Sequence, residues 1–283
     1  MPDYLRIFAL FVIVLVNVQA IAFSVFDAFP DLVGGTTSDR VTIWLVNGLV
    51  LLKTYGLFSF MFGVGLGFLM RASARRGLAF GKVYRNRMIG LAILGVLHGC
   101  LFFVGDILTI YAIAGSILYF VRNWAIRRLI TLAAVLFCLH FLVNIPILLL
   151  PAEPAPQDFL DFERFALTEG SFVDAVIFRS IGYVFALSFL LILQGMSALA
   201  WFCLGLAAVK AGMIDDTAHP LWARARRICL APGVALSLAG AGLVAFGSTA
   251  PGAVLVLLAA PIASLGYLGV IAAIANPPGP FMA

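Results

Sequence analysis

The segment MIGLAILGVLHGCLFFVGDILTIYAIAGSILYFV, residues Met88–Val121, decides the fold. Its only acidic or basic side chains are His98 and Asp106, and the rest is apolar all round, as in helices that face lipid or lie fully buried. The run is long enough for two short helices, and we expect the chain to break at Gly105-Asp106. The segment therefore predicts two membrane crossings.

The composition of the chain extends this prediction to all 283 residues. Apolar residues make up 63% and charged residues 11% of the sequence, whereas a soluble domain has about 25% charged residues. A mean hydropathy of +1.11 excludes a water-soluble globule. We expect one all-α, polytopic membrane domain over 1–283, located in the inner (cytoplasmic) membrane of a bacterial cell.

Eight crossings are predicted from the apolar runs, because a helix of about 20 residues spans the hydrocarbon core. The first run could instead be a cleaved secretory signal, but Asn17 and Gln19 interrupt its core and favour an uncleaved helix. The runs are Ile7–Phe26, Val41–Met70, two within Met88–Val121, Leu129–Leu150, Ile181–Val209, Ile228–Phe246 and Ala253–Ile274.

The charged residues predict the orientation. With the N-terminus in the cytoplasm, the inner loops hold fourteen of the 18 basic residues and the outer loops ten of the 13 acidic ones, as the positive-inside rule requires. We interpret the basic segment 71–87 as a topology determinant against anionic headgroups, not as a nucleic-acid site. The inner basic residues are Arg6, Arg71, Arg75, Arg76, Lys82, Arg85, Arg87, Arg122, Arg127, Arg128, Lys210, Arg224, Arg226 and Arg227.

The longest outer loop, Pro151–Arg179, is acidic and begins with several prolines. Phenylalanines then recur at helical spacing from Phe159 to Phe165, which predicts a short helix in the outer interface. Such a helix could cover a substrate entrance or seal the bundle, and sealing is favoured. Ser171, with Asp174 three residues on, resembles the N-cap of the next helix.

Ionisable residues inside a bilayer cost about 2.5 to 3.5 kcal/mol each at mid-depth, so those retained there need an explanation. Counted at about 1.5 Å per residue from the inner basic boundary, Lys53 lies about 27 Å up and Asp106 about 28 Å up. We therefore expect these two side chains to form an ion pair near the outer boundary. The alternative is that Lys53 extends outward alone and Asp106 caps the turn.

His98 lies eleven residues beyond Arg87, about 16 Å from the inner boundary and near the midplane. On one continuous helix, His98 and Asp106 would be about 12 Å apart along the axis, so a direct hydrogen bond is excluded unless the helix breaks before Gly105. Gly95 and Gly99 make the helix thin at this level, which allows a close helix neighbour or a ligand.

Two further patterns favour packing. Gly63 and Gly67 form a GxxxG pair typical of closely packed helices; the surrounding residues lack the strand, Lys and Ser/Thr that a phosphate loop needs. His140 and Asn144 are one turn apart and can share a helix face. The spacing of the cysteines indicates neither a disulfide framework nor a metal site.

Several segments resemble the YeiB-like family of bacterial membrane proteins. The likeness covers residues 1–121 well and the rest only as hydrophobic spans. The segments are Asp3-x-x-Arg6, Phe8-Ala9-Leu10, Leu15-Val16-Asn17, Phe58-Ser59-Phe60-Met61-Phe62-Gly63-Val64-Gly65, Tyr84-Arg85-x-Arg87, Leu97-His98, Gly105-Asp106-Ile107-Leu108 and Tyr111-Ala112.

The YeiB-like family is distantly similar to transmembrane acyltransferases, including the heparan glucosaminide N-acetyltransferase group. This resemblance implies transfer of an acyl group from cytoplasmic acyl-CoA to an extracytoplasmic acceptor, often a sugar, with acyl-CoA as a co-substrate and no permanently bound cofactor. The implied catalytic residues are His98 and Asp106. The implied CoA-binding residues are Arg71, Arg75, Lys82, Arg85 and Arg87, and the acceptor-orienting residues are Lys53, Asn17 and Tyr111.

Two features depart from the family pattern. Ile7 stands where the family has Gly, and the sequence stops after Asn276-Pro277-Pro278-Gly279, where family members continue into further spans. On the resemblance alone, we expect a short or truncated member. Two other functions remain open on the residues alone. The midplane polar side chains could line the path of a transporter or flippase, or the chain could be a non-enzymatic membrane scaffold.

Overall fold

The computed structural model describes residues 7, 36–151 and 156–275. Asn17 and nearly all of the first predicted span lie outside the described residues. All regular elements of the described part are helical. They are α2 Thr37–Leu49, α3 Lys53–Arg75, α4 Phe80–Leu101, α5 Leu108–Val121, α6 Ile126–Leu149, α7 Gln157–Arg164, η2 Phe165–Glu169, α8 Phe172–Leu190, η3 Leu191–Gly195, α9 Met196–Lys210, α10 Pro220–Phe246 and α11 Thr249–Ile274.

Five helical stretches of the described chain are long and apolar enough to cross a membrane: 37–75, 126–149, 172–210, 220–246 and 249–274. α5 is a shorter apolar helix, and it pairs with α4. The prediction of an all-helical, multi-pass membrane protein in a lipid bilayer is therefore confirmed. The count of eight crossings and the side of the N-terminus stay predictions.

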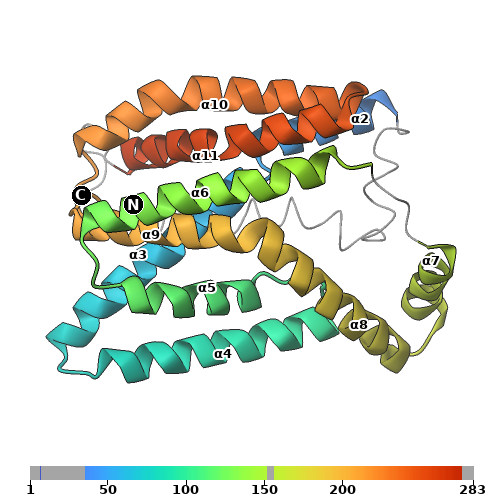
Figure 1. Cartoon of the computed structure of the whole chain (residues 1–283), viewed down its shortest axis with the longest axis horizontal. Coiled ribbons are helices and arrows are strands. Elements are labelled where there is room, and N and C mark those ends of the chain that lie inside the picture. The colour runs from blue at the N-terminus through green and yellow to red at the C-terminus, as the bar shows by residue number, and fades with distance from the viewer. Residues whose placement is uncertain (1–6, 8–35, 152–155, 276–283) are drawn as a thin grey trace.

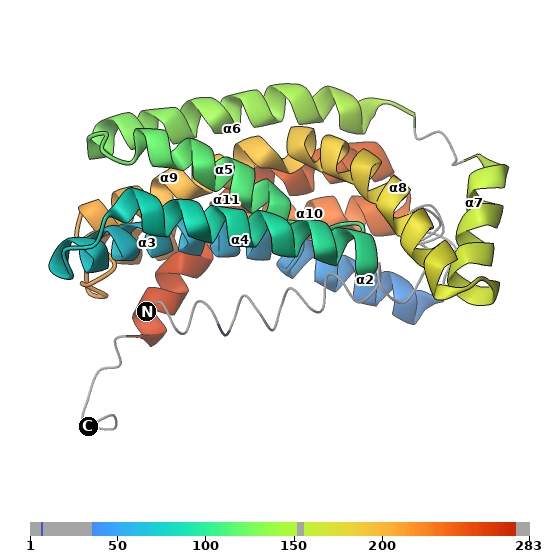
Figure 2. The ribbon, with the colours of Figure 1, turned by 90° about the horizontal axis from the view of Figure 1, so that it is seen from below.

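Figure 1 shows the long helices lying side by side with their connections gathered at two ends. The α3–α4, α5–α6 and α9–α10 connections lie together at one end, here called the basic end, where the predicted inner basic residues from Arg71 to Arg227 are found. The acidic α7 and the start of α8 lie at the opposite end. Figure 2 shows the α4–α5 hairpin on one face of the bundle, with α6 along an edge.

The closest packing in the bundle joins α3 to α9. A β-carbon on Gly63 would collide with the backbone carbonyl of Phe202, and one on Gly205 would collide with that of Phe60. The side chain of Val209 fills the space beside Gly67. The predicted close packing at the GxxxG pair is thus confirmed, with α9 as the neighbour.

The predicted span Val41–Met70 is two helices, with a break between α2 and α3. Leu52, at the break, has a φ of 65°, a conformation that costs a branched residue energy. The fully buried Lys53 donates from Nζ to the carbonyl of Asn47 at 2.7 Å, in the last turn of α2. Carbonyls at a helix C-terminus lack intrahelical donors and attract cations, so this end of α2 supplies the partner of the ammonium group.

The predicted ion pair between Lys53 and Asp106 is wrong. Among the described residues Lys53 is bonded to Asn47 and Asp106 to His98. The depth count to Asp106 ran past the end of α4 at Leu101, where the chain turns back and brings Asp106 to His98. The count to Lys53 lies within α3, but the break at Leu52 places the end of α2 beside its ammonium group.

The outer segment follows its prediction. The short helix α7 continues into the π-helical turn η2, and Phe159 and Phe162 lie against Phe178 of α8. Ser171 and Asp174 form a capping box, so α8 begins at Phe172. The apolar span predicted from Ile181 is thus the continuation of a helix whose first turns contain Asp174 and Arg179.

His140 and Asn144 share a face of α6, as predicted. The Asn144 Nδ2 lies 3.0 Å from the His140 Nδ1 and also donates to the His140 carbonyl at 2.8 Å. The imidazole further contacts the backbone of Leu193, in the π-helical turn η3. Both side chains are buried.

We expect Gly63→Ala to lower the melting temperature of the detergent-solubilised protein. The added methyl would push against the backbone of Phe202, and overpacking of this kind costs about 1 to 3 kcal/mol. Gly90→Ala is the matched control, because nothing lies within 4 Å of a β-carbon at Gly90. Equal melting temperatures for the two variants would contradict the close α3–α9 contact.

Candidate functional site

The turn between α4 and α5 brings the two predicted catalytic residues together. α4 ends at Leu101, and the amides of Phe102 and Phe103 both donate to the carbonyl of His98, at 2.9 and 3.0 Å. The chain then reverses into α5, and the Asp106 Oδ1 lies 3.0 Å from the His98 Nδ1. The sequence predicts a direct contact only if the helix breaks before Gly105, and this condition is met because α4 ends at Leu101.

Asp106 also caps α5 and links the pair to α8. Its Oδ2 accepts a hydrogen bond from the backbone amide of Thr109 at 3.1 Å. The Thr109 hydroxyl oxygen in turn accepts from the Tyr183 hydroxyl at 2.6 Å. Three helices thus fix the carboxylate, and its side chain is only 1% exposed.

Two glycines of α4 make this approach possible. A β-carbon on Gly95 would collide with the Thr109 hydroxyl and would lie 2.9 Å from the Asp106 Oδ2. A β-carbon on Gly99 would collide with the ring of Tyr183. The thin stretch of helix expected from the sequence therefore accommodates helix neighbours, not an open ligand site.

The arrangement suits a general base. In the tautomer with its proton on Nδ1, His98 donates to Asp106, and the lone pair of Nε2 is left to accept a proton. A carboxylate in this position also stabilises the imidazolium that forms when a proton is taken up. The His98 side chain is 44% exposed, and within the described chain no other residue hydrogen-bonds its ring.

If α4 and α5 cross the membrane as predicted, their lengths place the pair inside the hydrocarbon core. His98 is about 16 Å beyond Arg87 along α4 at 1.5 Å per residue. α5 has 14 residues, which makes it about 21 Å long, against a core of about 30 Å. In Figure 1 the α4–α5 turn stops short of the α10–α11 connection and of the start of α8.

The basic residues proposed to hold CoA divide into two groups. Arg71 is engaged within the protein, with Nη1 2.6 Å from an Asp215 carboxylate oxygen and Nη2 donating to the Val209 carbonyl at 2.6 Å. Arg75, Lys82, Arg85 and Arg87 are exposed at the basic end. Within the described chain none of these four is paired with a carboxylate.

A cavity of about 360 Å³ lies between α3 and α4 near the basic end. The Arg87 guanidinium sits 5.5 Å from the centroid of the Phe62 ring at one side of it. Eleven residues turn an α-helix by about three turns and 20°, so Arg87 and His98 share one edge of α4. The lining residues are Phe58, Met61, Phe62, Gly65, Phe68, Leu69, Ala72 and Arg87.

Of the predicted acceptor-orienting residues, Asn17 lies outside the described chain, and Lys53 and Tyr111 have partners other than His98. Tyr111 is a core residue whose hydroxyl lies 2.6 Å from the Ser59 hydroxyl, and Lys53 is bonded at the end of α2. Sequence reasoning missed Thr109 and Tyr183. Thr109 follows Asp106 at the spacing of a helix cap and could have been found, whereas nothing in the sequence pairs Tyr183 with Thr109.

The fold and site define a multi-pass helical membrane protein with a carboxylate–imidazole pair between its helices. The chain is similar to the uncharacterized protein YxaH of Bacillus subtilis (strain 168), with 30% identity over 155 residues. The match covers 52% of this chain and 37% of YxaH, so the chain spans well under half of that relative. No protein-family profile matches the chain, and no solved structure matches it significantly.

We expect Asp106→Ala to destabilise the detergent-solubilised protein by about 1 to 2 kcal/mol, because it removes the cap of α5 and the partner of His98. Asp106→Asn keeps an oxygen for the Thr109 amide and should lose less than half as much. Thermal unfolding of both variants measures the difference. An alanine variant as stable as the wild type would remove the capping role.

We expect diethyl pyrocarbonate to modify His98 faster than His140, because His98 has the exposed side chain and His140 is only 6% exposed. Mass spectrometry of the two peptides after timed treatment gives both rates. A His98 ring that reacts as slowly as His140 lies out of reach of water, which would count against a catalytic base there.

Proposed function

We propose that this protein is a membrane-embedded acyltransferase that moves an acyl group from acyl-CoA to a hydroxyl or amine acceptor, with a sugar as the favoured acceptor class. The observation that carries the proposal is the 3.0 Å contact between His98 and Asp106, which holds an exposed imidazole with one nitrogen free. A base held by a carboxylate is the group that activates a weak nucleophile.

In the proposed reaction, His98 Nε2 takes the proton of the acceptor hydroxyl or amine as the acceptor attacks the thioester carbonyl. A new C–O or C–N bond forms and the C–S bond breaks. The CoA thiolate leaves and receives the proton from the imidazolium, which restores the neutral ring. Asp106 does not touch the substrates; it orients the ring and stabilises its charged form.

On the donor side, Arg75, Lys82, Arg85 and Arg87 are available to hold the CoA phosphates by charge-assisted hydrogen bonds. Arg71 would take part only by giving up its contact with Asp215. The cavity beside Arg87 has a mostly apolar lining, which suits the acyl chain of the donor, and Arg87 supplies a donor for a carbonyl of the pantetheine arm. Arg87 and His98 share an edge of α4 about 16 Å apart, which is of the same order as the length of that arm.

We further propose eight crossings, with the N-terminus and the basic end in the cytoplasm of a bacterial inner membrane. The support is the clustering of three basic connections at one end of the bundle and of acidic α7 at the other (Figure 1). Acyl-CoA would then enter from the side where positive charge collects.

We expect acyl-CoA to raise the melting temperature of the purified protein, since a ligand that binds only the folded state stabilises it. His98→Gln should keep this shift but lower acyl transfer by about 10²- to 10⁴-fold, the usual contribution of a general base. His219→Asn is the control, because His219 caps α10 at the basic end. Transfer is measured by release of free CoA thiol in the presence of a sugar acceptor.

Unchanged transfer in His98→Gln would show that the imidazole is not the base. If acyl-CoA neither stabilises the protein nor loses its acyl group, the acyltransferase proposal fails. Substrate-driven flux in proteoliposomes would then favour a transporter, and its absence a scaffold.

A further inference from the structure

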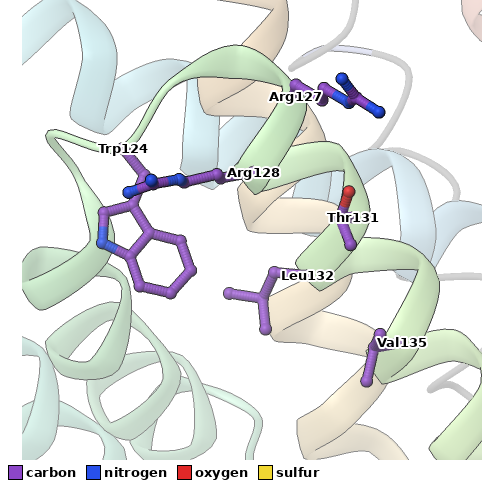
Figure 3. Close-up of a pocket in the computed structure, with 6 residues that line it drawn as sticks. All are labelled: Trp124, Arg127, Arg128, Thr131, Leu132 and Val135. Atoms are coloured by element: carbon purple, nitrogen blue, oxygen red, sulfur yellow. The ribbon is translucent and has the colours of Figure 1, made fainter.

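A second cavity, of about 490 Å³, lies at the start of α6, at the basic end. In Figure 3 the Arg128 side chain lies next to the Trp124 indole. Thr131, Leu132 and Val135 follow one another along the helix. Arg127 also lines the cavity and extends to the other side of the helix start.

The cavity carries positive charge that the described chain does not neutralise. Arg127 and Arg128 are both exposed, and no carboxylate of the described residues lies within 4.0 Å of either guanidinium. Lys210 of α9 adds a third cation next to the cavity, since its Nζ donates to the Trp124 carbonyl at 2.7 Å. Arginine pairs with phosphate through two parallel hydrogen bonds, so two unpaired arginines here favour a phosphate group.

The backbone of α6 adds donors at the same place. Its N-cap residue, Ala125, offers no side-chain hydrogen bond to the first turn. The first amides of an α-helix lack intrahelical acceptors and carry the positive end of the helix dipole, which attracts anions.

An apolar track leads away from these charges. Leu132 and Val135 line the cavity, and Leu139 and Leu142 continue the same stripe at helical spacing. Leu132 is half-buried against the core, whereas Val135, Leu139 and Leu142 are exposed on the outside of the bundle, Val135 to 49% and Leu142 to 70%. Tryptophan is enriched at membrane interfaces, where one edge of the indole meets headgroups and the rest meets acyl chains.

We propose that this cavity binds an anionic phospholipid of the leaflet at the basic end, with its phosphate at Arg128 beside the Trp124 indole and an acyl chain along Leu132 and Val135. Arg127, on the other side of the helix start, adds to the positive potential that attracts the headgroup. The arginines lie at the start of α6 and the apolar residues lie further along the helix. A phospholipid has the same order along the membrane normal, with the charged headgroup outside and the acyl chains inside. A soluble phosphate would use the arginines but leave the apolar track unused. The site is independent of His98 and of the acyl-transfer proposal.

The test is native mass spectrometry of the detergent-solubilised protein given equal amounts of phosphatidylglycerol and phosphatidylcholine. The wild type should retain the anionic lipid preferentially, and Arg127→Gln/Arg128→Gln should reduce that retention about tenfold or more, because each basic residue near an anionic headgroup contributes about 1 kcal/mol. Arg224→Gln/Arg227→Gln is the matched control; it removes two exposed charges from the start of α10, at the same end but outside the cavity.

Three outcomes would overturn the proposal. The wild type could retain both lipids equally, or the control pair could lose as much retention as the cavity pair, which would indicate general attraction to the basic end. Alternatively, inorganic phosphate or CoA at the lipid's concentration could displace the bound lipid completely, which would assign the site to a soluble anion. Arg127→Lys/Arg128→Lys checks folding and should keep part of the preference, because the charge remains while the paired hydrogen bonds are lost.

Discussion

The interior of a bilayer offers no water to polar groups, so each polar side chain between these helices needs a partner within the protein. In this fold three ionisable side chains have their partners where helices end or change pitch. Asp106 reaches His98 across the α4–α5 turn, Lys53 reaches a carbonyl at the end of α2, and His140 contacts the π-helical turn after α8. The breaks in the helices and the polar residues therefore explain one another.

Glycines determine how closely the helices approach at the same levels. Gly63 and Gly205 let α3 and α9 meet backbone to backbone, which forms the rigid centre of the bundle. Gly95 leaves space for the Asp106 carboxylate that caps α5, and Gly99 leaves space for the ring of Tyr183. The end of α4 that carries His98 is thereby held against both α5 and α8. A base fixed in this way loses little orientational freedom when it meets a substrate.

The sequence predicted the helical membrane fold, the interface helix, the α8 cap, the glycine packing and the His140–Asn144 pair, because each depends on hydropathy or on residues within one or two turns. It did not predict the break at Leu52 or the end of α4 at Leu101. In a membrane helix the residues before and after the helix end are equally apolar, so the hydropathy pattern does not show where the helix ends. Counting rise per residue past the end of α4 misplaced Asp106, and the break at Leu52 gave Lys53 a partner in α2 that the count could not show.

The short length of α5 has a consequence for proton traffic. A helix of about 21 Å in a hydrocarbon layer of about 30 Å leaves roughly 9 Å between the α4–α5 turn and the far surface. With the proposed orientation, a proton exchanged between His98 and water would therefore meet a thinner electrostatic barrier toward the end of α7 than toward the basic end. The membrane's own voltage would act on such a proton across only part of its full drop.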